Sequence, residues 1–228
     1  QMILAGTLLK LGGYGLLRMS TIIHESMQHL ASPLIIFAMC GVVVSALLCS
    51  RQTDLKSLIA FSSVSHMGLV VAASMIKSPW SVSGAMILMI SHGLVSSALF
   101  CLANTAYERT NSRTIMILQG SQIILPLAAA WWLLSTMLNM ALPPSTSFLG
   151  ELLILLSVFK WSPYSITLAG LGIMFTTSYS LYLFWSSQRE HLPPHLKTLP
   201  PTSTREHTLL ALHITPIIAL IACPNLFF

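Results

Sequence analysis

The chain has 228 residues, of which 54% are hydrophobic and only 7% are charged. Because an ordinary soluble domain carries about 25% charged residues, this composition excludes a soluble globular protein and indicates a polytopic membrane protein. The formal net charge is +5, but the basic residues are scattered among loops without interleaved aromatic residues, so they do not predict a nucleic-acid partner.

Seven segments are long and apolar enough for membrane helices, which need about 20 predominantly apolar residues. In chain order they are 2–17, 31–50, 58–76, 83–103, 119–159, 164–185 and 208–222. The sequence therefore predicts an all-α transmembrane helix bundle, with a single domain over residues 1–228. Because the first residue is Gln1 and the first apolar segment starts at once, we expect upstream residues to be missing.

The fifth segment is too long for one straight helix, and Pro143 and Pro144 lie in it. Proline has no backbone N–H and blocks the continuation of a helix. We therefore expect a broken helix, made of 119–141 and then about 147–159. Broken helices at membrane depth are tolerated inside protein or beside water, and they often lie beside transport pathways.

Basic residues predict the orientation of the segments. If the segments alternate, seven Lys and Arg residues fall on one side, in the loops 51–57, 104–118 and 186–207. Three fall on the other side, in the loops 18–30, 77–82 and 160–163. Loops rich in Lys and Arg stay on the side of synthesis, so we expect the first set there and the C-terminus on the opposite side.

Lys10 lies within the first apolar segment, and Gly6, Thr7 and Gly13 share its helical face. A charged side chain at bilayer depth costs about 2.5–3.5 kcal/mol on insertion scales, so it is a functional-site hypothesis by default. The small neighbours leave room for water, with which the amine can exchange protons. The alternative is a lysine that snorkels to a nearby helix end.

Two histidines lie in the third and fourth segments. Ser62 and Ser63 precede His66 by one helical turn, and Ser96 follows His92 by one turn. A histidine beside hydroxyl groups can pass protons, because its unperturbed pKa is about 6.5. The alternative is a neutral ring that is satisfied by the serines.

Glu151 follows Gly150 just after the proline break, among apolar residues. It is either a carboxylate stabilised by the dipole at a helix N-terminus or a proton carrier, and the two roles are compatible. Two histidines, a lysine and a glutamate in four different segments favour a proton relay over four coincidences.

The sequence shows no metal or cofactor site. Cys40, Cys49, Cys101 and Cys223 lie in or beside apolar runs without a C-x-x-C pair, whereas ligand sets for zinc or iron–sulfur clusters are more closely spaced. We therefore expect four small buried apolar residues. No Gly-rich phosphate loop and no flavin, nicotinamide or quinone site is recognisable.

Four short runs carry a resemblance to a known family: LLKLGGYG at 8–15, RQTDLK at 51–56, SSVSHMG at 62–68 and FLGE at 148–151. They resemble the family of chain 4 of mitochondrial NADH–ubiquinone oxidoreductase, an antiporter-like proton-pumping subunit of respiratory complex I. The resemblance extends to at least Arg205 and implies fourteen transmembrane helices, of which this chain would hold the last seven as a C-terminal fragment.

The resemblance also implies roles and partners. Lys10 would be the central lysine, His66 and His92 relay histidines, and Glu151 the terminal carboxylate of the proton route. The family's other lysine and its glutamate partner lie upstream, so the isolated fragment is not expected to pump. NADH, FMN, iron–sulfur clusters and ubiquinone would be bound by partner subunits. The neighbours would be other membrane subunits and the lipid bilayer of the mitochondrial inner membrane, with the more basic loops on the matrix side.

We therefore expect proton translocation coupled to electron transfer from NADH to ubiquinone. The main alternative is a stand-alone cation/proton antiporter subunit. A retinal-type protein needs a Schiff-base lysine in an aromatic pocket, and only Tyr14 lies near Lys10. A passive membrane scaffold is the remaining alternative, in which loss of the Lys10 charge would change stability alone.

Overall fold

The computed structural model describes residues 3–22, 24–189 and 200–222. The helices of these residues, in chain order, are η1 Leu4–Leu8, α1 Leu9–Ile22, α2 His24–Ser50, α3 Leu55–Ile76, α4 Pro79–Thr110, η2 Ile115–Leu118, α5 Ser121–Ile124, α6 Pro126–Asn139, α7 Thr146–Trp161, α8 Ser165–Gln188 and α9 Thr204–Ala222. Here η1 is a π-helix and η2 a 3₁₀-helix. The described residues contain one isolated β-bridge and no longer strand, so the prediction of an all-α bundle is confirmed.

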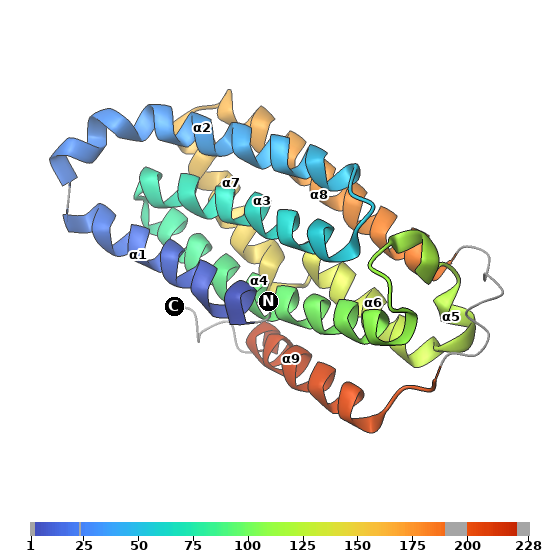
Figure 1. The fold of residues 1–228 in the computed structure, drawn as a ribbon. Helices are drawn as coiled ribbons and strands as arrows, with labels where there is room; N and C mark the ends of the chain where they lie inside the picture. Colours follow the sequence, from blue (N-terminus) through green and yellow to red (C-terminus); the bar gives the residue numbers. More distant parts are fainter. Residues whose placement is uncertain (1–2, 23, 190–199, 223–228) are drawn as a thin grey trace.

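Helix α4 is the central element of the bundle. It packs against η1, α1, α3, α6, α7 and α9. In Figure 1, α2 and α8 run along one side of the bundle and α9 along the opposite side. A helix that is apolar around its whole circumference is typical of such a buried position, and 83% of its most apolar window is buried.

Four stretches of helix are each long and apolar enough to cross a membrane: Leu30–Ser50, Leu55–Ile76, Pro79–Thr110 and Ser165–Gln188. A bent pair, Ile115–Ile124 with Pro126–Asn139, adds a fifth crossing if it counts as one span. The first and last predicted segments are also helical, as α1 and α9. The chain is thus a multi-pass membrane protein. That it forms one domain, within a fourteen-helix fold, stays a prediction.

The predicted break at Pro143 and Pro144 is confirmed, since α6 ends at Asn139 and α7 begins at Thr146. Ser145 caps the new helix, because its side chain accepts a hydrogen bond from the Phe148 N–H, as serine commonly does at this position. The break therefore starts a helix inside the chain's longest apolar segment, and Glu151 lies less than two turns after the cap.

Two other predictions about the segments are wrong. The residues 18–30 are not a loop, because α1 continues to Ile22 and α2 begins at His24. The residues 119–141 do not form one helix, because the chain leaves helical geometry at Leu125 (φ −124°, ψ 66°) before Pro126. The residue before a proline is disfavoured in the α region, and the resulting bend between the flanking helices is 120°.

The basic loops gather at one end of the bundle, which we call the charged-loop end. It is defined by an antiparallel bridge between Asp54 and Thr114 and by an ion pair from Arg109 to Glu206, with 2.5 Å between Nη2 and Oε2. Residues 190–199 of the predicted loop 186–207 lie outside the described part of the chain.

The prediction of four buried cysteines is partly wrong. Cys40 is exposed on α2, whereas Cys49 and Cys101 are buried. Cys223 lies outside the described residues.

Candidate functional site

The four predicted site residues come from four different helices: Lys10 from α1, His66 from α3, His92 from α4 and Glu151 from α7. His66, His92 and Glu151 are only 3%, 4% and 5% exposed. The fold thus concentrates three ionisable groups in the interior of an apolar bundle, where each needs a partner or water.

His66 and Glu151 form a buried pair. The His66 Nδ1 atom lies 3.3 Å from the Glu151 Oε1 atom. The ring nitrogen does not point at the oxygen well enough for a hydrogen bond, so the contact is an ion pair when the ring is protonated. Removing one partner of such a pair leaves a costly isolated charge, so His66 and Glu151 form one interacting unit in the interior of the bundle.

The imidazole rings of His66 and His92 lie side by side. Their centroids are 4.6 Å apart and their planes are inclined by 36°. The Nε2 atoms of both rings are buried and have no hydrogen-bond partner among the described residues. Because a bridging water can connect polar groups that do not touch, the two rings are placed for a water-mediated contact between α4 and α3.

The serines near the histidines do not satisfy the rings. Ser62 donates to the Ile59 carbonyl and Ser63 to the Ala60 carbonyl, both one turn earlier in α3. Ser96 likewise donates to its own helix, at the Gly93 carbonyl. Such bonds to the preceding turn are usual for serine in helices. The structure therefore does not show the alternative, in which a neutral ring is satisfied by hydrogen bonds with these serines.

Two glycines bring Glu151 to His66. A Cβ atom at Gly150 would lie 2.9 Å from the Leu88 backbone nitrogen, and one at Gly84 would lie 3.0 Å from the Gly150 carbonyl oxygen. Real Cβ contacts are essentially never so short, so only glycine permits this approach of α7 to α4. The close crossing draws α7 inward and directs the neighbouring carboxylate into the bundle.

A second close crossing brings Lys10 to Gly93, the residue that follows His92 in α4. A Cβ atom at Gly93 would lie 3.2 Å from the Gly6 carbonyl oxygen and 3.6 Å from the Lys10 Cε atom. The lysine side chain therefore passes over Gly93, next to His92 in the sequence. Its Nζ donates to the Ala5 carbonyl in the π-helix η1, and irregular turns of this type are frequent at functional sites.

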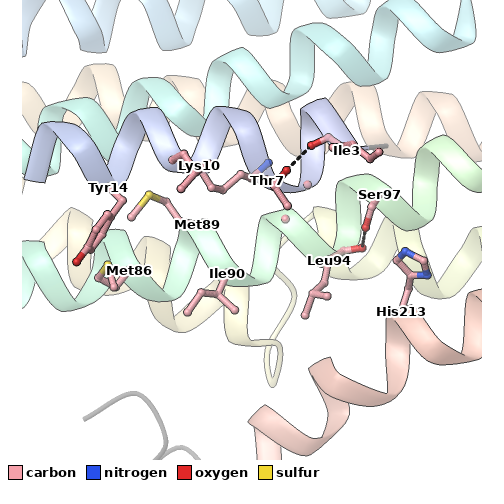
Figure 2. A pocket seen from close by; sticks show the side chains of 13 residues that line it. Ile3, Thr7, Lys10, Tyr14, Met86, Met89, Ile90, Leu94, Ser97 and His213 are labelled. Atoms are coloured by element: carbon pink, nitrogen blue, oxygen red, sulfur yellow. Dashed lines mark hydrogen bonds between the residues drawn. The ribbon is translucent and has the colours of Figure 1, made fainter. Parts of the chain in front are cut away.

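Lys10 also borders a groove of about 800 Å³ between α1, α4 and α9. Figure 2 shows Lys10, Thr7 and Tyr14 on one wall, and Met89 and Ser97 on α4. Of the small neighbours expected to leave space around Lys10, Gly6 and Thr7 do line this groove. Gly13 does not, because a Cβ atom there would lie 2.7 Å from the Met89 sulfur.

The sequence prediction missed Tyr179 of α8. Its side chain is 1% exposed, and its hydroxyl is buried without a hydrogen-bond partner among the described residues. The sequence does contain an indication of Tyr179, because residues 176–180 form a polar run, Thr-Thr-Ser-Tyr-Ser, within an apolar segment. Asn139 and Thr146, on the two sides of the helix break, also have buried side-chain oxygens without a described partner.

The charged residues near Asp54 pack as an ordinary surface cluster. The Lys56 Nζ donates to Asn104 Oδ1 at 3.3 Å and lies 4.5 Å from the centre of the Tyr107 ring. Within residues 3–22, 24–189 and 200–222, no group of three His, Cys, Asp or Glu side chains is placed to hold a metal ion.

Comparison with known families tests the resemblance. A family model described as NADH:quinone oxidoreductase/Mrp antiporter, transmembrane, matches residues 1–177. The chain belongs to this family. A retinal-type protein is thereby left without support.

Curated relatives in the family are named NADH-ubiquinone oxidoreductase chain 4. Those from Carassius auratus, Danio rerio and Scyliorhinus canicula are 55%, 53% and 55% identical to this chain over 228 residues. Each match covers 100% of this chain and 50% of the relative. The chain thus spans about half the length of the curated relatives it matches.

Solved structures share the fold. A chain of respiratory complex I from Thermus thermophilus with bound NADH superposes with a TM-score of 0.89 at 25% identity, covering 95% of this chain and 46% of that chain. A chain of the Mrp complex from Dietzia sp. DQ12-45-1b superposes at 0.83 with 18% identity, covering 99% and 50%. The helix arrangement is therefore that of antiporter-like membrane subunits.

Proposed function

We propose that this chain is the C-terminal half of a proton-translocating membrane subunit of NADH:ubiquinone oxidoreductase, respiratory complex I. The observation that carries the proposal is the succession Lys10, His92, His66, Glu151 through the bundle. The curated relatives at 52–55% identity favour the complex over a stand-alone cation/proton antiporter.

Protons pass along this succession in steps. Lys10 gives up a proton toward His92, because its Cε atom lies close to Gly93, the next residue of α4. A neutral imidazole accepts a proton on one nitrogen and releases one from the other. His66 delivers the proton to Glu151, because its Nδ1 faces that carboxylate at 3.3 Å. Water molecules complete the steps at the unpartnered Nε2 atoms, since buried polar groups of this kind are typical sites for internal water.

Electrostatic repulsion makes the relay carry one proton at a time. Two unit charges at the 4.6 Å separation of the His66 and His92 rings repel by about 4 kcal/mol at an effective dielectric constant of about 20. Both rings are therefore not charged together, and a proton arriving at His92 must wait until His66 has passed its own proton to Glu151. A change in the charge of Glu151 is thereby transmitted to Lys10.

The redox chemistry belongs to partner subunits under this proposal. NADH, FMN, iron–sulfur clusters and ubiquinone would be bound there, while this chain contacts other membrane subunits and the lipid of the mitochondrial inner membrane. The charged-loop end would face the matrix, because Lys and Arg concentrate on the side of synthesis.

Neutralising the ends of the relay tests the proposal. Lys10→Ala and Glu151→Gln are introduced into the full-length subunit, and the assembled complex is reconstituted in vesicles. Both variants are expected to lower the number of protons moved per NADH oxidised. Lys160→Ala is the matched control for loss of a positive charge, because Lys160 is exposed near the end of α7 and lies outside the relay.

Two results contradict the proposal. If both relay variants assemble and move protons at the normal ratio, the relay assignment is wrong. If the vesicles show a cation-dependent pH change without any electron donor, the antiporter alternative is favoured instead.

A further inference from the structure

Among the described residues, Tyr179 is the largest of the fully buried side chains. It lies in α8 at the junction with α3 and α7, and its ring is 1% exposed. Its hydroxyl lies beside Ser65 and Ser62 of α3, but within the described part of the chain it is not aligned for a hydrogen bond. Burying an unpaired hydroxyl costs free energy that a phenylalanine would not, so this hydroxyl calls for an explanation.

The surroundings of the hydroxyl suit the passage of a proton. Ser65 and Ser62 of α3 lie beside it, and Glu151 lies in its neighbourhood. Both serines donate their own protons to backbone carbonyls of α3, those of Ser62 and Ile59. Their oxygens therefore remain available as acceptors, and the tyrosine O–H is the group that can donate.

Tyr179 also lies on the way from the relay to the charged-loop end. Ser62 is one turn closer than His66 to the start of α3, and α8 continues beyond Tyr179 to Gln188. At that end of α8 the buried Ser121 hydroxyl contacts the Ser187 carbonyl oxygen at 3.1 Å and Gln188 Oε1 at 2.9 Å. Buried polar groups thus occur on both sides of Tyr179 along the helix.

We propose that the Tyr179 hydroxyl is a further proton-passing group, which connects the His66–Glu151 pair with the charged-loop end of the bundle. The inference rests on the proposed function, because Tyr179 would add a branch to the proton relay formed by the four residues of the candidate site. It concerns a residue of the same subunit and needs no cofactor.

The step conserves charge on the ring. The phenol oxygen takes a proton from the Glu151 side, through a bridging water where needed, and forms a new O–H bond. Its original O–H bond breaks, and that proton moves to water beside the Ser65 and Ser62 oxygens. The tyrosine is neutral before and after the step, and no oxidant or reductant takes part.

The experiment removes only the hydroxyl. Tyr179→Phe keeps the ring and its packing, and Tyr179→His restores a side chain that accepts and releases protons. Tyr182→Phe is the matched control, because Tyr182 lies on the same helix and is 47% exposed. Each variant is made in the full-length subunit, and the rate of proton uptake during NADH oxidation is measured per assembled complex.

We expect Tyr179→Phe to slow proton uptake on the order of tenfold, which is less than the roughly 100-fold or more typical of a positioned proton-transfer group, because water replaces part of its role. Tyr179→His should recover part of the rate, and Tyr182→Phe should behave as the unchanged protein. A normal rate in Tyr179→Phe would overturn the inference. Equal losses in the Phe and His variants would also overturn it, because they would indicate a packing role.

The two proposals fail separately. If Glu151→Gln lowers proton uptake while Tyr179→Phe does not, the relay stands without the tyrosine branch. If neither variant lowers proton uptake, the proposed function itself fails.

Discussion

Gly150→Ala tests whether the close crossing of α7 and α4 holds the His66–Glu151 pair together. The added Cβ would lie 2.9 Å from the Leu88 nitrogen, 3.1 Å from the Leu88 Cβ and 3.2 Å from the Gly84 oxygen. Two of these three atoms belong to the backbone of α4, which cannot swing aside as the end of a flexible side chain can. The helices must therefore separate.

The size of the effect follows from these distances. An ordinary contact begins at 3.4 Å, so α7 has to withdraw by about 0.5 Å, and overpacking of this kind costs about 1–3 kcal/mol. The same withdrawal lengthens the 3.3 Å contact between His66 Nδ1 and Glu151 Oε1. Because a 1 Å misplacement costs about 100-fold in rate, we expect proton uptake to fall on the order of tenfold.

The assay combines thermal unfolding of the assembled complex with proton uptake in vesicles. Gly170→Ala is the control, because a Cβ atom at Gly170 of α8 meets nothing within 4 Å and alanine is the better helix former. Gly170→Ala should be as stable as the unchanged protein or more so. If Gly150→Ala matches it in both stability and uptake, the crossing does not position Glu151 and the reasoning is refuted.

Two further predictions concern elements that hold the bundle in shape. Ser145→Ala removes the cap that accepts a hydrogen bond from the Phe148 N–H at 3.3 Å, so we expect thermal unfolding to show a loss of stability of about 1 kcal/mol. Ser83→Ala within α4 is the control and should have no such effect. Equal stability of the two variants would contradict the capping role. Arg109→Ala breaks the 2.5 Å ion pair with Glu206 that joins α4 to α9 and should destabilise the protein by about 1 kcal/mol or less, because the pair is partly exposed. Salt screens such pairs, so the difference should shrink at high ionic strength, and a difference independent of salt would argue against an electrostatic cause.

Much of the fold follows from local properties of the sequence. The length of the apolar runs is enough to place α3, α4 and α8 in the membrane, and the helix break follows from Pro143 and Pro144, because a missing N–H acts within one turn. Pro126 acts in the same local way, and its effect on 119–141 was available from the sequence although the prediction overlooked it. Helix ends were less predictable, since apolar composition does not reveal that α4 extends to Thr110.

For the candidate site too, some features follow from the sequence and others only from the tertiary structure. The sequence by itself determined which side chains are chemically out of place in lipid, namely Lys10, His66, His92 and Glu151, because a charge in an apolar run is conspicuous without any structure. Only the tertiary structure decided that His66 lies 3.3 Å from Glu151 and beside His92, and that Tyr179 of α8 lies near them. Those distances depend on which helices cross at Gly84, Gly93 and Gly150, and crossings between distant segments arise from packing in three dimensions.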